Sequence, residues 1–394
     1  MEYLIYISYI SLASWLYISF LHGRSFSSDE GLFWKNEIIF EEKLNFNKQL
    51  VFTDSICIMI PARNEEKTIL KTLNSIKNQS YENLQVLVID DNSSDKTRKI
   101  VNRFKKGFKK LKLLKGKQLP PGWVGKTWAL KQAVDQANKK FFNYYLFVDS
   151  DITFSKNLLK KVIHFSKSED FLMISLMAKL NCNSFWEKML IPSFIFFFQK
   201  LYPFNYVNDK KKNLAAAAGG FIFCKASEFK KENLYNKIRN KVIDDCNIAK
   251  LLKKKGAIWL GLTNQIKSGR SYKNLNSIWN MVSRTAFEQL NHSLILLFIC
   301  ILGLTIVYLF PLTIIVIILL FYQLDLQHLH LVVVNLTSYI LMIRIILPTL
   351  KFYGVNKHYA LAIPITAILY ICMTITSAIN YTLFFGNTWK GRKY

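Results

Sequence analysis

The sequence predicts an α/β protein in which helices cover both faces of a mostly parallel sheet, with transmembrane helices at the N-terminus and the C-terminus. Three observations support this fold class. From Ser55 onward, short apolar runs alternate with segments of helical periodicity, which is the pattern of a parallel sheet wound with helices. Residues 3–21 carry no charge and are as long as the roughly 20 apolar residues that a membrane-spanning helix needs. Further long apolar stretches follow His292.

The apolar runs in the central part of the chain indicate strands. Residues 56–60 and 84–89 are almost entirely apolar, which is typical of strands buried on both faces of a sheet. Shorter strands are expected at 111–114 and 145–148. The helices expected between and after these strands cover residues 65–78, 95–104, 126–138 and 247–255.

Polar residues follow three of the expected strands, at residues 61–65, 90–94 and 149–151. Ligands of such sheets bind beyond the carboxyl ends of the strands, and these ends meet at one edge. The three segments bring several carboxylates to that edge, where they would repel one another unless a cation lay among them. Helix caps and turns alone do not account for this clustering, which therefore predicts a functional site.

The Asp149-Ser150-Asp151 triplet predicts a metal site. It directly follows a buried strand, and its two carboxylates are spaced to hold a hard divalent cation through oxygen ligands. Such an ion takes its remaining ligands from water and from a substrate diphosphate. A solvated turn is the alternative interpretation of the same three residues.

Two further positions suit a nucleotide. At the end of the second expected strand, a carboxylate of the Asp90-Asp91 pair can accept the imide hydrogen of uracil or bind ribose hydroxyls, as acidic residues at such strand ends do. Lys126 opens a helix after the turn at residues 120–125, where both its ammonium group and the helix N-terminus favour phosphate. Because the chain has no GxxxxGKS or GxxxxGKT sequence, we expect a looser diphosphate contact than a Walker loop makes.

A glycine pair and an acidic pair complete the expected site. Gly219 and Gly220 suit a close approach of the backbone to a substrate, although a tight turn into a strand also explains them. Asp244 and Asp245 come just before an expected helix, so that one can cap the helix while the other faces the cleft. A partly desolvated Asp beside other carboxylates has a raised pKa, which suits a general base. Two capping acids are the alternative interpretation.

The composition limits the partners of the protein. The chain has 53 Lys and Arg against 26 Asp and Glu, which gives a formal net charge of +27. Most of the basic residues lie in the central part, which predicts attraction to an anionic membrane surface. No nucleic-acid partner is expected, because the basic run 103–117 offers only Phe104 and Phe108 for base stacking. The six cysteines lack CxxC spacing, which argues against zinc or a disulfide framework and indicates a reducing, cytoplasmic setting.

The apolar ends divide the chain into three expected regions. Residues 1–23 form an N-terminal transmembrane anchor rather than a cleaved signal, because Glu2 stands where a signal peptide has basic residues. Residues 24–292 form a cytoplasmic domain. Residues 293–394 form a transmembrane region with a short basic tail and three or four spans, since Pro311 can kink one helix or mark a turn between two. We expect an integral protein of the inner (plasma) membrane.

Several motifs, in their order along the chain, resemble those of family 2 glycosyltransferases, which have the GT-A fold. They are PARNEE at 61–66, VIDDNSSDKT at 88–97, DSD at 149–151, AGG at 218–220 and IDDCNIAKLLKKKG at 243–256. More narrowly, further segments resemble the hopene-associated branch of this family. These are LPPGWVGKTWAL at 119–130, IWLGLT at 258–263, the stretch 278–290 and the C-terminal WKGRKY. The resemblance covers nearly the entire chain.

The resemblance implies roles for individual residues. The catalytic base would be Asp245, and Asp91 would contact the nucleobase of a nucleotide-sugar donor. The metal, Mg²⁺ or Mn²⁺, would be held by Asp151 and Asp149. The residues expected on the acceptor side are Gly219, Gly220 and Asp244. The residues expected to bind the donor are Pro61, Arg63, Glu65, Asp91, Lys126, Asp149, Ser150 and Arg284.

Arg284 lies where the family often has the arginine of a QxxRW motif, but Met281 and Thr285 replace the glutamine and the tryptophan. The full motif is typical of synthases that extend polysaccharides, so its partial form favours a single-transfer enzyme. The resemblance therefore implies a membrane-bound, inverting, metal-dependent glycosyltransferase of the hexosyltransferase type. A polysaccharide-type synthase and a catalytically inactive membrane scaffold are the alternatives.

The expected acceptor is a lipid, because the central domain is tied to the membrane on both sides. The hopene-associated resemblance implies a hopanoid or another isoprenoid lipid, and we expect a UDP-sugar as the donor. Residues 185–203 are rich in aromatic residues but interrupted by charges and by Pro192. They look like an interfacial segment where a lipid hydroxyl could enter, with an ordinary core helix as the alternative.

Overall fold

The computed structural model describes residues 2–22, 53–383, 388–389 and 392–393. These residues form two compact units. The sheet unit holds residues 53–181 and 204–271 together with the last described pairs, and the helical unit holds residues 2–22, 182–203 and 272–383. The boundary expected at residues 23 and 24 lies outside the described residues, and the three expected regions stay a prediction.

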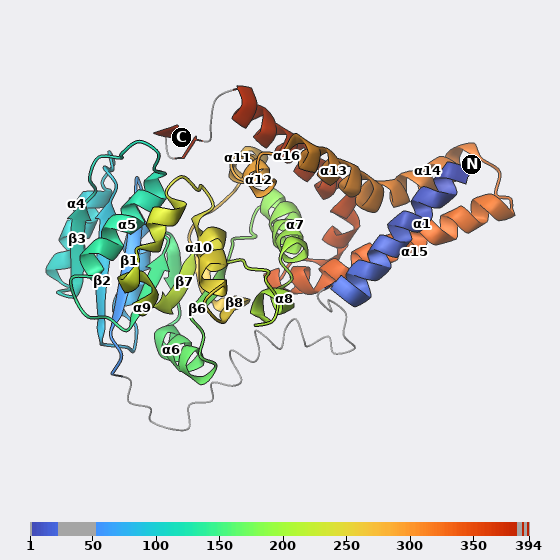
Figure 1. Ribbon diagram of the computed structural model, residues 1–394. Coiled ribbons are helices and arrows are strands. Elements are labelled where there is room, and N and C mark those ends of the chain that lie inside the picture. The colour runs from blue at the N-terminus through green and yellow to red at the C-terminus, as the bar shows by residue number, and fades with distance from the viewer. Residues whose placement is uncertain (1, 23–52, 384–387, 390–391, 394) are drawn as a thin grey trace. The chain divides into compact units, whose positions relative to one another are not determined.

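The sheet unit is built on an eight-stranded sheet with the strand order β3-β2-β1-β4-β7-β6-β8-β5 (Figure 1). The strands are β1 (Ile56–Ala62), β2 (Leu84–Asp90), β3 (Leu111–Lys115), β4 (Tyr144–Val148), β5 (Ile152–Phe154), β6 (Met173–Lys179), β7 (Phe221–Lys225) and β8 (Ile258–Ser268). The neighbours β3, β2, β1 and β4 are parallel, as are β6 and β8. The remaining pairs, β4 with β7, β7 with β6 and β8 with β5, are antiparallel. A separate small sheet pairs β9 (Thr388–Trp389) with β10 (Arg392–Lys393).

The directions of these strands determine which strand ends lie at the same edge of the sheet. Because β7 is antiparallel to both of its neighbours, β6 and β8 run in the same direction as β1 and β4. The carboxyl ends of β1, β2, β4 and β8 therefore share one edge of the sheet, and the antiparallel β7 begins there. The predicted α/β fold class is confirmed, although the reversed strand β7 makes the sheet mixed.

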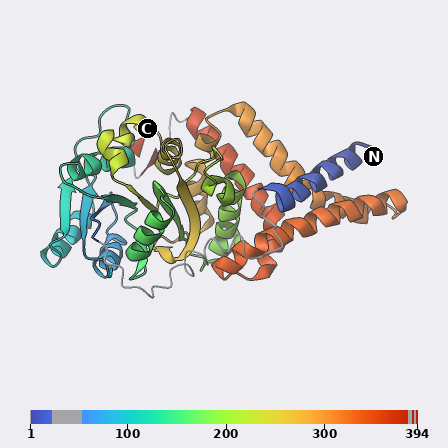
Figure 2. The same ribbon diagram turned by 60° about the horizontal axis from the view of Figure 1, so that its bottom comes forward.

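Helices cover both faces of this sheet (Figures 1 and 2). The helices of the unit are α3 (Ile69–Lys77), α4 (Thr97–Lys106), α5 (Gly125–Ala137), α6 (Leu158–Ser168), α8 (Phe204–Asn208), α9 (Ser227–Lys231), the 3-10 helix η3 (Leu234–Ile238) and α10 (Asp244–Lys253). On one face, α3, α4 and α6 share a core with strand residues such as Ile58 and Leu146. Successive strand residues point to opposite faces, so Phe147 points to the other face, where it contacts the rings of Phe229 and Tyr235. Helix α5 packs on β1 and β2.

The helical unit holds the long apolar segments. Its helices are α1 (Glu2–Leu16) with the π-helical turn η1 (Tyr17–Leu21), α7 (Phe185–Leu201), α11 (Leu275–Ser283), α12 (Ala286–Gln289), α13 (Leu294–Leu304), the π-helical turn η4 (Thr305–Leu309), α14 (Phe310–Phe321), α15 (Leu326–Tyr353), η5 (Lys357–Ala362) and α16 (Ile363–Leu383). Among the described residues, four stretches are long and apolar enough to cross a membrane: Glu2–Leu21, Leu294–Phe321, Leu326–Tyr353 and Lys357–Leu383. Three of these candidates lie in the C-terminal region. Pro311 lies in the first turn of α14, where a missing N–H is tolerated, and it does not divide Leu294–Phe321 into a hairpin.

Polar contacts connect distant segments within the helical unit. Asn335 Nδ2 donates to Ser8 Oγ at 2.8 Å, and Trp15 Nε1 donates to the carbonyl of Val307 at 2.8 Å, which ties α1 to the C-terminal helices. Glu187, at the start of α7, is fully buried and accepts a hydrogen bond from the backbone N–H of Tyr272 at 2.6 Å. Residues 185–203 thus contain a helix of this unit, and their interfacial role stays a prediction.

Candidate active site

The loops after β1 and β2 are joined by reciprocal hydrogen bonds. The backbone N–H of Asn64 donates to Ser93 Oγ at 3.1 Å, and that of Glu66 donates to Asp95 Oδ2 at 3.0 Å. In return, Glu66 Oε2 accepts from the N–H of Lys96 at 3.0 Å. Several side chains of the PARNEE and DDNSSDKT motifs therefore hold one loop against the other.

Two asparagines shape these loops. Asn64 and Asn92 both have φ of 54°, in the left-handed region that Asn tolerates better than most residues. The backbone N–H of Glu65 donates to Thr97 Oγ1 at 2.7 Å, which adds a further link between the loops. These hydrogen bonds therefore fix the backbone positions from which the side chains of Glu65 and Asp91 extend.

The end of β2 lies against the end of β1. The backbone N–H of Asp91 donates to the carbonyl of Ala62 at 2.8 Å, and Arg63 Nη1 donates to the carbonyl of Asp91 at 2.7 Å. A Cβ on Gly116 would lie 2.9 Å from the carbonyl oxygen of Asp90, so this position requires glycine. A cavity of about 840 Å³ adjoins this strand end and is lined by Asn92 and by residues 115–119.

Lys126 lies at the centre of an acidic cluster that consists of Asp149, Asp244 and Asp245. This residue of the first turn of α5 places Nζ 3.1 Å from Asp149 Oδ1 and 3.3 Å from Asp244 Oδ1. Burial alone would lower the pKa of the Lys126 ammonium, but the carboxylates of Asp149, Asp244 and Asp245 raise it above its ordinary value. Lys126 is therefore charged at neutral pH and offsets part of the negative charge of the cluster.

Asp245 is a carboxylate of α10 with a raised pKa. Helix α10 begins at Asp244 rather than near residue 247, so the expectation that one carboxylate caps this helix is wrong: the N-cap is Ile243. Asp244 pairs with Lys126, and Asp245 Oδ1 accepts from the N–H of Cys246 at 2.7 Å. Burial and the charge of Asp244 raise the pKa of Asp245 to about 6, although Lys126 acts in the opposite direction. Asp245 is therefore mostly ionised at neutral pH and still basic enough to accept a proton.

The glycine pair lies directly against this cluster. Gly219 and Gly220 precede β7, which begins at the same edge of the sheet. A Cβ on Gly219 would lie 3.0 Å from Asp245 Oδ2 and 3.1 Å from Lys126 Nζ, and one on Gly220 would lie 3.2 Å from Ile152 Cδ1. The absence of a side chain at Gly219 thus lets the backbone approach Asp245 closely. The acceptor-side role of the pair stays a prediction.

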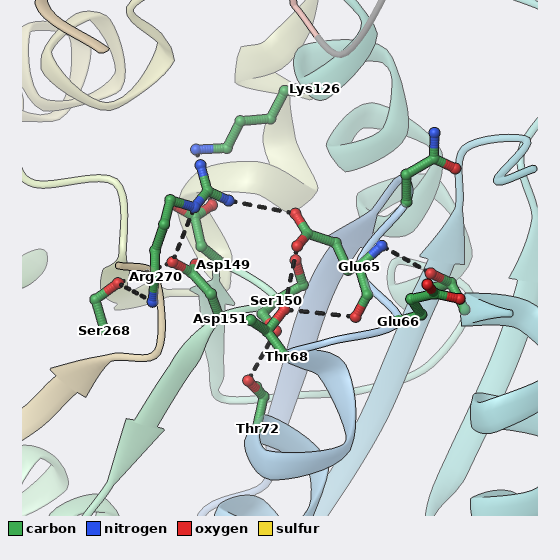
Figure 3. Close-up of polar contacts among 12 residues, drawn as sticks. Glu65, Glu66, Thr68, Thr72, Lys126, Asp149, Ser150, Asp151, Ser268 and Arg270 are labelled. Atoms are coloured by element: carbon green, nitrogen blue, oxygen red, sulfur yellow. Dashed lines mark hydrogen bonds and ion pairs between the residues drawn. The ribbon is translucent and has the colours of Figure 1, made fainter. Parts of the chain in front are cut away.

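Asp151 has a different set of partners, which the sequence reasoning missed. Asp151 Oδ2 accepts from Ser268 Oγ at 2.8 Å and lies 3.4 Å from Arg270 Nε. Arg270 Nη2 lies 3.4 Å from Glu65 Oε1, so the guanidinium group bridges the loop after β1 and the turn after β4 (Figure 3). Burial raises the pKa of Asp151, while Arg270 lowers it. Ser268 is the last residue of β8 and Arg270 follows it, so the rule that ligands lie at strand ends would have found them.

The carboxylates fit a divalent cation that binds together with a diphosphate. Among the described residues, no group of three or more His, Cys, Asp or Glu could hold a metal ion alone. Mg²⁺ commonly binds through one or two carboxylates and takes its other ligands from water and substrate phosphates. Asp149 and Asp151 supply two such carboxylates. Ser150 between them is buried, and its carbonyl accepts from Thr72 Oγ1 at 2.8 Å, which fixes the turn.

The other predicted site residues are distributed as follows. Pro61 is a buried residue of β1, and its position agrees with a place at the sheet edge. Arg284 belongs to the helical unit, where it follows α11 as its C-cap. The role of Arg284 in donor binding stays a prediction, as do the individual roles of the residues of the sheet unit.

Comparison with known proteins identifies the domain. The model of the family described as Glycosyl transferase family 2 matches residues 57–231. A β-monoglucosyldiacylglycerol synthase of Synechocystis sp. is 28% identical over 118 residues, which are 29% of this chain and 24% of that protein. A GalNAc(5)-diNAcBac-PP-undecaprenol β-1,3-glucosyltransferase of Campylobacter jejuni is 29% identical over 96 residues, which are 24% of this chain and 29% of that protein. The chain thus spans less than a third of the length of these two curated relatives.

A solved structure extends the likeness to the fold. A mannosyltransferase from Pyrobaculum calidifontis, in complex with GDP-Man and Mn²⁺, matches with a TM-score of 0.52 and 13% identity, over 93% of this chain and 99% of that one. At this identity the likeness shows the fold alone, and the resemblance to the hopene-associated branch stays a prediction. The family match, the mixed sheet and this neighbour agree, so residues 57–231 are a glycosyltransferase family 2 domain with a GT-A-like fold.

Proposed function

We propose that the protein is a membrane-bound, inverting, metal-dependent glycosyltransferase that moves a sugar from a nucleotide-sugar donor to a hydroxyl group of a lipid. The proposal depends above all on Asp245. This carboxylate lies beside Lys126 and Gly219 at the ligand-binding edge of the sheet, and its pKa is raised to about 6. A side chain placed only to cap a helix needs neither this environment nor this pKa.

The proposed reaction is a single displacement. Asp245 accepts the proton of the acceptor hydroxyl while the hydroxyl oxygen attacks the anomeric carbon and the bond from that carbon to the nucleoside diphosphate breaks. Asp244, which pairs with Lys126, precedes the base in the chain and would border the acceptor. Asp151 and Asp149 would hold Mg²⁺ or Mn²⁺, which offsets the charge of the departing diphosphate when it is bound.

The donor is proposed to lie along the ends of β1 and β2. The cavity there is lined by Lys115 and Lys117, whose charges favour an anionic ligand. Gly116 also lines it, and a Cβ on this residue would lie 3.1 Å from the Cα of Asp91. Asp91 would contact the nucleobase, for which we propose uracil. Arg63 and Glu65 lie in the loop after β1 and would border the donor from that side.

A lipid acceptor is favoured by two findings. The described chain has four candidate membrane helices. The names of the two curated relatives point to a glucosyldiacylglycerol and to an undecaprenol-linked glycan. We propose a hopanoid or another isoprenoid lipid as the acceptor and an inner (plasma) membrane location with the catalytic domain in the cytoplasm. The strongly basic chain would then lie close to the anionic leaflet, which attracts Lys and Arg.

Donor binding tests this proposal first. The full-length protein is purified in detergent with Mn²⁺, and its thermal stabilisation by UDP, GDP, CDP and ADP is compared with that of Asp151→Ala. We expect stabilisation by UDP that requires both Mn²⁺ and Asp151. No metal-dependent stabilisation by any of the four nucleotides would overturn the proposal and favour the inactive scaffold. Transfer from a matching UDP-sugar to an isoprenoid alcohol or to diacylglycerol, with Asp245→Asn as the control, then tests the acceptor.

A further inference from the structure

The two carboxylates of the Asp149-Ser150-Asp151 turn are paired with different basic side chains. Asp149 pairs with Lys126 at 3.1 Å, whereas Asp151 pairs with Arg270 at 3.4 Å. A divalent cation that binds both carboxylates therefore comes close to two positive side chains, which repel it unless one of them moves away. Figure 3 shows that Arg270 lies between Asp151 and Glu65.

Arg270 holds its carboxylates less firmly than Lys126 does. Lys126 contacts two carboxylates at 3.1 and 3.3 Å, and its side chain is 20% exposed. Arg270 contacts its two carboxylates at 3.4 Å each, and its side chain is 36% exposed. A longer distance and a better hydrated side chain both weaken an ion pair. Arg270 is therefore displaced from its carboxylates more easily than Lys126 is.

The backbone around Arg270 keeps its side chain near the site when it moves. The N–H of Gly269 donates to the carbonyl of Asp151 at 2.6 Å, and Asn181 Nδ2 donates to the carbonyl of Arg270 at 2.6 Å. A guanidinium group that leaves Asp151 therefore stays at the edge of the sheet, where it can pair with a diphosphate in the bidentate manner that suits arginine.

We propose that Arg270 is an internal counter-cation of the metal site. It occupies Asp151 in the donor-free protein and gives this carboxylate up when a divalent cation arrives with the diphosphate. This inference rests on the proposed function and adds a positioning residue to it. Metal binding then depends on the donor, because the diphosphate supplies both metal ligands and a new partner for Arg270. The same coupling must strengthen nucleotide binding when the metal is present.

The test measures Mn²⁺ binding by electron paramagnetic resonance on the full-length protein in detergent, with and without UDP and corrected for Mn²⁺ bound to UDP in solution. Without UDP, Arg270→Gln is expected to bind Mn²⁺ about three- to fivefold more tightly than the wild type, because the competing charge is gone. The factor by which UDP increases Mn²⁺ affinity should fall correspondingly. Ser268→Ala removes the hydrogen bond to Asp151 but no cation, so its donor-free Mn²⁺ affinity should not rise.

Different outcomes separate this inference from the proposed function. If Arg270 only supports the fold of the turn, Arg270→Gln will bind Mn²⁺ equally or more weakly without UDP, and the inference is overturned. If the wild type shows no Mn²⁺ binding that depends on UDP, the proposed donor site is wrong, and the inference fails with it. Should Arg270→Gln not fold, Arg270→Lys provides the same test, with an expected gain of about twofold because lysine lacks the planar fork of donors.

Discussion

The replacement of Lys126 by methionine removes the cation from the acidic cluster and keeps most of the side-chain volume. The variant leaves the carboxylates of Asp149 and Asp244 without the ammonium group that lies 3.1 and 3.3 Å away. Removing one partner of a buried ion pair typically costs about 3–5 kcal/mol. Because the Lys126 side chain is 20% exposed, solvent screens part of this interaction, and we expect a loss of about 2 kcal/mol at pH 7.

The loss should depend on pH in a defined direction. Without Lys126, the pKa values of Asp244 and Asp245, which burial already raises, move further above the value of about 3.9 that an Asp has in the unfolded chain. A carboxyl group whose pKa is raised on folding favours the folded state at low pH and loses this contribution as the pH rises through the folded pKa. The difference in stability between wild type and variant should therefore be small at pH 5 and grow towards pH 8.

Thermal unfolding in detergent between pH 5 and 8 measures this effect. A loss of about 2 kcal/mol corresponds to a midpoint lower by roughly 4–8 °C for a domain of this size. Lys131→Met is the matched control, because Lys131 lies on the same helix and pairs with the more exposed Asp135, which should contribute well below about 1 kcal/mol. A decrease for Lys126→Met that is no larger than that of the control, or that does not change with pH, would refute the role assigned to Lys126.

Two further predictions concern the base and its neighbour. Asp245→Asn should lower turnover by about 10²–10⁴-fold in a folded protein. The turnover of the wild type should fall about tenfold per pH unit below the Asp245 pKa of about 6, because protonated Asp245 cannot act as a base. A turnover that stays constant between pH 4.5 and 7 would exclude Asp245 as the base. Gly219→Ala places a methyl group 3.0 Å from Asp245 Oδ2 and 3.1 Å from Lys126 Nζ, so we expect roughly tenfold lower turnover with a little-changed melting temperature. Unchanged turnover would show that the position of Asp245 is not set by this close approach.

The pattern of apolar and polar residues predicted the positions of several strands. The strands expected at 56–60, 84–89 and 145–148 agree with β1, β2 and β4 to within two residues. Each is an apolar run ended by polar residues, so its position follows from the chain itself. The antiparallel insertion of β7 between β4 and β6 depends on pairing between distant segments, which no periodicity within β7 determines.

The same distinction applies to the candidate site. The strand-end rule led to Asp149 and Asp151 because their positions follow from a local motif. The pairing of Lys126 with Asp244 joins residues more than a hundred positions apart, and the sequence predicted only a phosphate contact for this lysine. Arg270 was missed because β8 was not predicted as a strand of the same sheet.

The hydrogen bonds between the loops after β1 and β2 have a consequence for recognising inactive relatives. The side chains of Asn64, Ser93, Glu66 and Asp95 each accept a hydrogen bond from the backbone of the opposite loop, so these motif positions stabilise the backbone whether or not a sugar is transferred. A chain that had lost its base would still need them and would still match the family signature in this region. If Asp245 is the base proposed above, the identity of the residue at position 245 is therefore a better indicator of transfer chemistry than the first two motifs.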